Sequence, residues 1–365
     1  MKQSELFKLA CECLLLDENP GLKEGIEEKF ISGEIDLDKF VYLCSNHLVL
    51  PAITLKFQNH GLLDVFPSEY ANHLQNIYNL NRKRNREILQ QIDEINTALK
   101  KENIQPVYLK GTANLMDNLY SDIGDRMIGD IDFLVTEKDY LKTAYLIFKL
   151  GYKNDKTVYY DIKKIKHYPR LYREDVPADI EIHRIPVDIQ HSKMFSSNLI
   201  FENKMKIADK TNCFVSSDTH KLIHTFIHSQ LGNRGYRFRI IPLRDLYDFH
   251  LLSKRVDWQD VLKEVEEKNK AQIFFDTVSY LLNTSSNISV LKNKNSNKFA
   301  IQHKWFLNHP KTHRYYINTL KLYYLISQRV LKAFINKDAF RNIYVRVKDP
   351  KGYKRLYTGI KGYFS

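Results

Sequence analysis

Asp130 and Asp132 stand one residue apart at the start of an apolar run that continues to Val135. Because side chains alternate along a strand, this spacing places both carboxylates on one face. Such a pair can hold Mg²⁺, a hard cation that takes carboxylate oxygens together with the phosphates of a substrate. Upstream, the turn at Gly111 and Thr112 is expected to open a helix whose free backbone N–H groups can meet those phosphates. The combination indicates nucleotide chemistry.

A third carboxylate comes from Glu181, in a segment that alternates between polar and apolar residues over 178–183. This segment is expected to form a strand on which Glu181 and His183 share one face. In a mixed sheet, a neighbouring strand could bring Glu181 beside Asp130 and Asp132. Three carboxylates can hold two metal ions, which clamp the attacking and leaving oxygens of an in-line phosphoryl displacement.

Two cations close to these acids in the sequence are candidates for phosphate contacts. Lys110 directly precedes the glycine turn, and Arg126 lies in a polar loop expected over 121–129. The alternative for either cation is an ion pair with Asp130 or Asp125.

The chain divides into four regions by its pattern. Residues 1–103 are expected to be helical and to include one extended helix over 68–101, which contains no Gly or Pro. Residues 104–216 combine short strands with helices and form the predicted catalytic core. Residues 217–285 are helical again, and 286–365 form an aromatic, basic and mainly helical tail. The predicted fold class is therefore α+β, with a mixed β-sheet core, flanking helices and a helical region at either end.

Within the core, the pattern predicts a strand over 105–109 and a helix over 112–120 with Thr112 near its N-cap. A strand over 131–135 and a helix over 137–150 follow. A further strand is expected at 158–160.

The composition is that of a folded protein without a membrane-spanning helix. Hydrophobic residues make up 43% of the chain and aromatic residues 12%, and no apolar run approaches the roughly 18 residues that a transmembrane helix needs. The N-terminus carries an acid early and shows no small-residue cleavage site, so no signal peptide is expected. The four cysteines lack the spacing of a zinc site or a disulfide framework and are expected to be buried thiols in a reducing compartment. These features predict a cytoplasmic protein.

The net charge of +13 is concentrated in the tail. Residues 286–365 contain 17 Lys and Arg against two acids, whereas residues 1–285 contain 39 Lys and Arg against 41 acids. Tyrosines such as Tyr315 and Tyr323 are interleaved with the basic residues, as they are on surfaces that stack on nucleic-acid bases. The tail could therefore contact RNA or an anionic membrane surface. The alternative is an amphipathic helix that packs on the body and leaves a basic face in solvent.

The fuller pattern resembles a known group of enzymes. A Gly-small turn, an Asp-x-Asp pair on a strand and a single acid on a later strand are typical of the polymerase-beta-like nucleotidyltransferase superfamily. Within it, the sequence resembles the bacterial family of uncharacterised nucleotidyltransferases over about residues 1–285. That likeness is carried by 109–111, Tyr120, Arg126, 129–135, the acid-apolar-His segment 181–183, His228 and 243–246. Thr112 departs from the Gly or Ser that usually follows the glycine in the superfamily.

The resemblance implies a nucleotidyltransferase-like fold and an Mg²⁺-dependent enzyme that moves a nucleoside monophosphate from an NTP to an acceptor hydroxyl. It implies that Asp130, Asp132 and Glu181 form a catalytic, two-ion metal site, in which Glu181 also helps to activate the acceptor. Nucleotide-binding residues would be Lys110, Gly111, Thr112 and Arg126. The acceptor stays open among a small molecule, a saccharide, a protein and RNA.

Other interpretations of the same residues stay open. One is a toxin-like nucleotidyltransferase that acts on RNA through the basic tail, and another is a non-catalytic binding subunit with a transferase fold. An Asp-x-Asp pair also occurs in nucleotide-sugar glycosyltransferases, but there the apolar strand typically leads into the motif. His220, His224 and His228 lie at helical spacing and could bind a metal. Because no carboxylate or cysteine nearby completes a zinc site, a packed helix face is the favoured interpretation.

Overall fold

The computed structural model describes residues 1–154, 165–208, 212–282 and 293–335. Contacts between residues divide the chain into two compact units, residues 1–300 and residues from 301 onward. The predicted strand at 158–160 lies outside the described residues. None of the described helices is both long enough and apolar enough to span a membrane.

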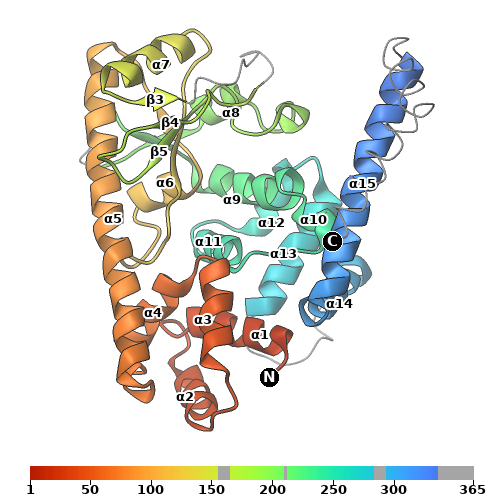
Figure 1. Cartoon of the computed structure of the whole chain (residues 1–365). Coiled ribbons are helices and arrows are strands. Elements are labelled where there is room, and N and C mark those ends of the chain that lie inside the picture. The colour runs from red at the N-terminus through yellow and green to blue at the C-terminus, as the bar shows by residue number, and fades with distance from the viewer. Residues whose placement is uncertain (155–164, 209–211, 283–292, 336–365) are drawn as a thin grey trace, which may run out of the picture. The chain divides into compact units, whose positions relative to one another are not determined.

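The first unit is built around a mixed sheet of seven strands in the order β3-β4-β5-β2-β1-β7-β6 (Figure 1). β2 runs parallel to β5 on one side and antiparallel to β1 on the other. This arrangement confirms the predicted α+β class. The strands are β1 (Val107–Tyr108), β2 (Asp130–Leu134), β3 (Lys153–Asn154), β4 (Leu171–Tyr172), β5 (Asp179–His183), β6 (Lys204–Lys206) and β7 (Phe214–Ser216).

Helices precede, interrupt and follow the sheet. The N-terminal region is helical, as predicted, with α1 (Gln3–Leu14), α2 (Lys23–Ile31), α3 (Leu37–Asn46), α4 (Leu50–Asn59) and α5 (Ser68–Lys101). Within the sheet region lie α6 (Lys110–Met116), α7 (Tyr140–Lys149) and α8 (Ser197–Glu202). After it come α9 (Asp218–Phe226), the π-helical turn η5 (Ile227–Gly232), α10 (Gly235–Phe238), α11 (Leu243–Ser253), α12 (Trp258–Glu264) and α13 (Lys268–Leu282). The tail contributes α14 (Lys294–Asn308) and α15 (Pro310–Ile335).

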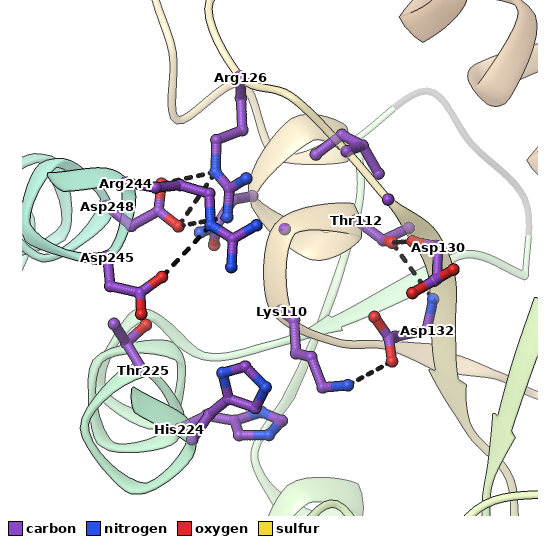
Figure 2. A pocket seen from close by; sticks show the side chains of 15 residues that line it. Lys110, Thr112, Arg126, Asp130, Asp132, His224, Thr225, Arg244, Asp245 and Asp248 are labelled. Carbon is purple, nitrogen blue, oxygen red and sulfur yellow. Dashed lines mark hydrogen bonds and ion pairs between the residues drawn. The ribbon is translucent and has the colours of Figure 1, made fainter. Parts of the chain in front are cut away.

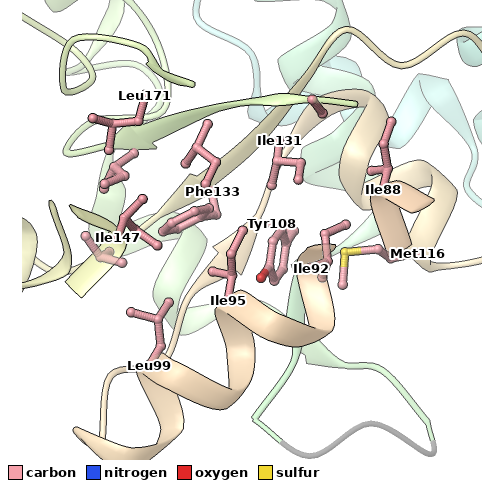
Figure 3. Packing of buried hydrophobic residues seen from close by; sticks show 14 of the residues in the cluster. Ile88, Ile92, Ile95, Leu99, Tyr108, Met116, Ile131, Phe133, Ile147 and Leu171 are labelled. Carbon is pink, nitrogen blue, oxygen red and sulfur yellow. The ribbon is translucent and has the colours of Figure 1, made fainter. Parts of the chain in front are cut away.

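The long helix α5 has the predicted bounds and packs one apolar face on the sheet. Ile88, Ile92, Ile95 and Leu99 recur at helical spacing and are fully buried with the sheet residue Phe133 (Figure 3). Burying each such side chain stabilises the fold by about 1.5–3 kcal/mol. The face of α5 that covers the sheet therefore anchors the strands that carry the acids.

Polar groups of α5 fix the loop that leads into β2. The Asn81 amide donates to the carbonyl of Gly124 at 2.8 Å, and the Asn85 amide donates to the carbonyl of Arg126 at 2.7 Å. Arg84 donates to the carbonyls of Ile128 and Pro177, which precede β2 and β5 respectively. One helix thus holds the starts of both acid-bearing strands in place.

Helix α6 begins and ends earlier than the predicted 112–120. Thr112 is not near the N-cap, which is Leu109; it lies inside the helix and is fully buried. The helix ends at Met116 because Asn118 adopts a left-handed φ of +49°. Asn tolerates that conformation better than most residues, and it stops the helix.

The cysteines and the histidine stripe behave as the sequence predicted. Cys11, Cys13, Cys44 and Cys213 are all buried. His220 and His224 are buried on α9. In the described parts of the chain, neither of these histidines belongs to a cluster that could hold a metal. Pro242 precedes α11 as its N-cap.

His47 gives the fold a pH-dependent link between α3 and α11. Its Nδ1 accepts a hydrogen bond from the backbone N–H of Leu243 at 3.1 Å. Burial lowers the pKa of His47 to about 4, although Asp245 opposes the shift. Since an unfolded histidine titrates near 6.5, protons bind the unfolded state more tightly. Stability that is present above pH 6.5 should be lost as the pH falls, by about 3 kcal/mol at pH 4.

Urea unfolding at pH 7 and pH 4 measures this loss. His47→Asn keeps a hydrogen-bond acceptor but does not titrate, so the variant should lose clearly less stability between the two pH values. The same pH dependence in both proteins would show that His47 is not responsible.

Candidate functional site

The register of β2 and β5 brings the predicted acids together. Asp132 lies directly opposite Glu181 in the parallel pair, and Asp130 lies opposite Asp179. The strand that carries Glu181, β5, is therefore the neighbour of β2, as expected. Asp132, Glu181 and His183 each offer one ligand atom, and these atoms all lie within 4.8 Å of one another. All three side chains are buried.

Lys110 is held against this group by an unusual backbone conformation. Its φ is +52°, in the left-handed region that non-glycine residues rarely adopt, and such strain tends to occur at functional sites. The Nζ atom lies 2.5 Å from Asp132 Oδ1 and 3.6 Å from Glu181 Oε2. Burial alone would lower the pKa of Lys110, but the charges of Asp132 and Glu181 outweigh burial and raise the pKa. Lys110 is therefore a fixed positive charge between the two acids.

The same contacts keep Asp132 and Glu181 ionised. Burial opposes ionisation of Asp132, but Lys110 and a hydrogen bond from His183 Nε2 at 2.8 Å hold the pKa of Asp132 below its ordinary value. For Glu181, burial is likewise outweighed by His183 and Lys110, and its pKa lies far below the ordinary range. Both side chains are thus carboxylates at neutral pH.

Asp130 sits nearer the solvent and is joined to the group through Arg170. One guanidinium nitrogen of Arg170 lies 3.1 Å from Asp130 Oδ2 and 3.1 Å from Glu181 Oε1. Burial raises the pKa of Asp130 to about 6, and the nearby Glu181 and Asp132 add to this shift while Arg170 opposes it. Asp130 is the acid of this group whose charge changes most readily.

Gly111 and Thr112 lie in the first turn of helix α6 beside the acids, and the Thr112 hydroxyl is bound to the backbone of β2. This hydroxyl donates to the carbonyl of Asp130 at 3.0 Å and accepts from the backbone N–H of Asp132 at 3.3 Å. A Cβ atom on Gly111 would lie 3.1 Å from the side chain of Ile128, so the start of α6 packs closely on the residues that precede β2. These contacts fix α6 against β2. A nucleotide-binding role for both residues stays a prediction.

Arg126 is paired with Asp248, so the alternative that it pairs with Asp130 or Asp125 is wrong. Its guanidinium binds Asp248 of α11 through Nε at 2.9 Å and Nη2 at 2.8 Å. Tyr120 donates to the same carboxylate at 2.8 Å. Arg126 is 7% exposed, and the charge of Asp248 overcomes the effect of burial and raises the pKa of Arg126. The pairing ties the loop before β2 to the helical region.

Asp130, Asp132, Lys110 and Arg126 belong to the lining of one open pocket, whereas Glu181, His183 and Arg170 do not line it. The volume of this pocket is about 720 Å³ with the open solvent at its mouth included. Figure 2 shows Asp130 and Asp132 on one side and Arg244 on the other, with Lys110 below. Arg244 contacts Asp245 only weakly, with Nε 3.4 Å from Oδ1. The pocket walls therefore carry both signs of charge. The remaining lining residues include Asn114, His224, Thr225 and His228.

Sequence reasoning did not assign four of these residues. His183 carried a signal, because it shares a strand face with Glu181. Arg244 and Asp245 stand in segment 243–246, which carries part of the family resemblance, whereas no sequence signal singled out Arg170. Only the fold brings these three residues to the pocket or its edge.

The donor set fits a divalent cation. Carboxylate oxygens of Asp132 and Glu181 are the ligands that Mg²⁺ prefers, and Asp130 adds another at the pocket mouth. His183 offers a nitrogen, which widens the choice to transition metals. Four carboxylates, counting Asp179, lie near the three cations Lys110, Arg170 and Arg84 in the described part of the site. The surplus of negative charge suits a bound cation.

Comparison with known protein families identifies the family to which the chain belongs. A profile of the family described as uncharacterised nucleotidyltransferases matches residues 33–282. The chain therefore belongs to this family and is a transferase enzyme. The matched span contains β2, β5, α9 and α11, which carry the walls of the pocket. No curated protein matches the chain.

Proposed function

We propose that this protein transfers a nucleoside monophosphate from an NTP to an acceptor hydroxyl with the help of Mg²⁺. The observation that carries the proposal is the parallel register that sets Asp132 opposite Glu181 beside a pocket in a chain of this family. Transfers of this kind need positioning and charge neutralisation more than covalent help, and the site offers both.

In this proposal, the carboxylates of Asp130, Asp132 and Glu181 hold the metal. Three carboxylates are enough for a site with two ions. A bound Mg²⁺ would neutralise charge that develops on the transferring phosphoryl group. Lys110 would add a positive charge to that of the metal. Its ion pairs with Asp132 and Glu181 hold the ammonium group at the pocket wall. Glu181 would also accept hydrogen bonding from the acceptor hydroxyl and orient it for attack.

The phosphate chain of the donor would cross the pocket from the acids toward Arg244. Lys110, Gly111, Thr112 and Arg126 are the nucleotide-binding residues proposed from the sequence. Arg126 is already paired with Asp248, whereas the ion pair of Arg244 with Asp245 within the described residues is a weak contact of 3.4 Å. Arg244 is thus the pocket cation with most freedom to bind phosphate.

Replacing Arg244 by Gln should weaken binding of inorganic tripolyphosphate with Mg²⁺ by about tenfold or more, because a hydrogen bond to a charged group contributes roughly 1.5–3 kcal/mol. Isothermal titration calorimetry measures the change. Arg86→Gln on the exposed face of α5 is the matched control and should bind like the wild type. Unchanged affinity in Arg244→Gln would remove Arg244 from the phosphate path.

The proposal is tested by labelling. Purified protein is incubated with Mg²⁺, each NTP labelled at the α-phosphate, and cell extract, and the labelled product is identified. The wild type should label an acceptor, and the double variant Asp130→Ala/Asp132→Ala should not. Equal labelling by both proteins would rule out nucleotidyl transfer at this site.

The RNA-directed alternative and the non-catalytic alternative predict other outcomes. Removal of the chain after about Asn297 should abolish RNA binding if the basic tail is an RNA platform. Unchanged, salt-sensitive RNA binding would exclude that role for the tail. A non-catalytic subunit would label nothing in the experiment above.

A further inference from the structure

A second, smaller pocket adjoins the first on the far side of two histidines. It measures about 290 Å³ up to its mouth, and His224 and His228 line both pockets. These histidines stand one turn apart, where α9 passes into the π-helical turn η5. π-helical turns are rare and occur frequently at functional sites. The histidine pair is therefore a shared wall between the two pockets.

The second pocket lies beyond the end of β5 that carries His183. Val187 and Asp188, just beyond β5, line it together with Lys166. The residue after Lys166, His167, forms a β-bridge with His183. A group held in this pocket would therefore lie close to the catalytic strand and outside the pocket that holds the phosphate path.

We propose that this second pocket is the acceptor subsite and that it takes a neutral sugar residue. The inference rests on the proposed function, because it supplies the hydroxyl that the transfer needs. Its walls contain both hydrogen-bond donors and hydrogen-bond acceptors. Lys166 and Asn233 can donate, and Asp188 can accept.

His224 adds an unsatisfied polar atom to the shared wall. The side chain is only 2% exposed, and its Nδ1 has no hydrogen-bond partner within the described residues. A buried polar atom without a partner is costly, so it indicates a missing ligand group or water.

The balance of charge distinguishes a sugar from charged ligands. Lys166 Nζ lies 3.2 Å from Asp188 Oδ1, so the two charges offset each other. Burial lowers the pKa of His228 to about 4 and the pKa of His224 as well, so both rings are neutral near pH 7. Because the pair has no net charge, this wall favours neither an anion nor a cation. Pro186 and Val187 supply apolar surface for the C–H face of a ring.

Gly232 offers a way to fill the second pocket alone. A Cβ atom there would lie 3.5 Å from the carbonyl oxygen of Ile227 and 3.6 Å from Asp188 Oδ2, which are ordinary contacts. A leucine at this position fits the backbone and extends toward the Asp188 wall. Gly232 lines only the second of the two pockets. Gly25→Leu, where nothing lies within 4 Å of the added Cβ, is the matched control.

The experiment compares donor binding with transfer in the full chain. With Mg²⁺, the affinity of Gly232→Leu for α,β-methylene NTP should stay within about twofold of the wild-type affinity. The amount of label that this variant transfers to the extract should fall by about tenfold or more. Lys166→Met, which removes a donor without adding bulk, should show the same split. Gly25→Leu should match the wild type in both measurements. Thermal unfolding confirms that each variant is folded.

Each outcome decides the inference. Wild-type labelling by Gly232→Leu and Lys166→Met, or an equal loss of analogue binding and labelling, would overturn the acceptor subsite. The wild-type product should resist protease and ribonuclease and show the nucleotide on a sugar by mass spectrometry. Label on an amino acid or on RNA would overturn the sugar assignment. A wild type that binds no NTP analogue would instead overturn the proposed function itself.

Discussion

Replacing Asp132 by Asn should reduce nucleotidyl transfer by about 10³-fold or more. The change removes one charged oxygen from the site that would hold the metal, and charge stabilisation by a metal contributes several kcal/mol to such reactions. It also takes away the carboxylate that lies 2.5 Å from Lys110 Nζ and accepts from His183. The measurement is the single-turnover rate at saturating Mg²⁺ and NTP.

The same variant should bind Mn²⁺, a spectroscopic substitute for Mg²⁺, about tenfold more weakly by electron paramagnetic resonance. Asp175→Asn provides the control, because Asp175 pairs with Arg173 away from the pocket and its side chain is 71% exposed. A rate near that of the wild type in Asp132→Asn would mean that the β2–β5 acids do not perform the chemistry.

Replacing Asp248 by Ala should destabilise the fold by about 3–5 kcal/mol. The change leaves the buried guanidinium of Arg126 without its carboxylate, and an uncompensated buried charge costs that much. It also removes the acceptor of the Tyr120 hydroxyl. Urea unfolding at pH 7 measures the free energy of unfolding.

A double variant tests whether the ion pair itself accounts for the lost stability. The role predicted for Arg126 in nucleotide binding is a separate matter. Arg126→Met/Asp248→Leu should recover much of the lost stability, because apolar groups of similar size remove both charges. Asp260→Ala, which breaks the exposed pair with Lys263, should cost less than about 1 kcal/mol. If Asp248→Ala costs as little as Asp260→Ala, Arg126 does not depend on Asp248 and is available to bind phosphate.

The local pattern was enough to predict the elements that carry the acids. The bounds of α5 follow from a long amphipathic stretch without Gly or Pro, and β2 and β5 follow from alternation around Asp132 and Glu181. The expectation that a neighbouring strand brings these acids together is confirmed, because their side chains occupy one face of adjacent strands. The metal and catalytic roles of the acids stay predictions.

Partners that are remote in the sequence could not be predicted. Arg126 and Asp248 are 122 residues apart, and only the packing of α11 beside the loop before β2 brings them together. Arg170 reaches Asp130 because β4 pairs with β5, and the two pockets share a wall because the π-helical turn follows α9. The start of α6 was misplaced because Thr112 bonds to the backbone of β2 instead of capping the helix.

For the basic tail, the sequence pattern predicted helical structure but no specific partner. Its helices α14 and α15 agree with the expected helical content, and residues 336–365 lie outside the described part of the chain. Contact with RNA or an anionic membrane stays a prediction for this region.

The most direct test of the central claim is which phosphate of the donor is transferred. Wild-type protein is given Mg²⁺, cell extract and the same NTP labelled at either the α- or the γ-phosphate. Nucleotidyl transfer predicts that the acceptor gains the α-label and that the γ-label leaves with pyrophosphate. An acceptor that gains the γ-label, or neither label, would contradict nucleotidyl transfer by this protein.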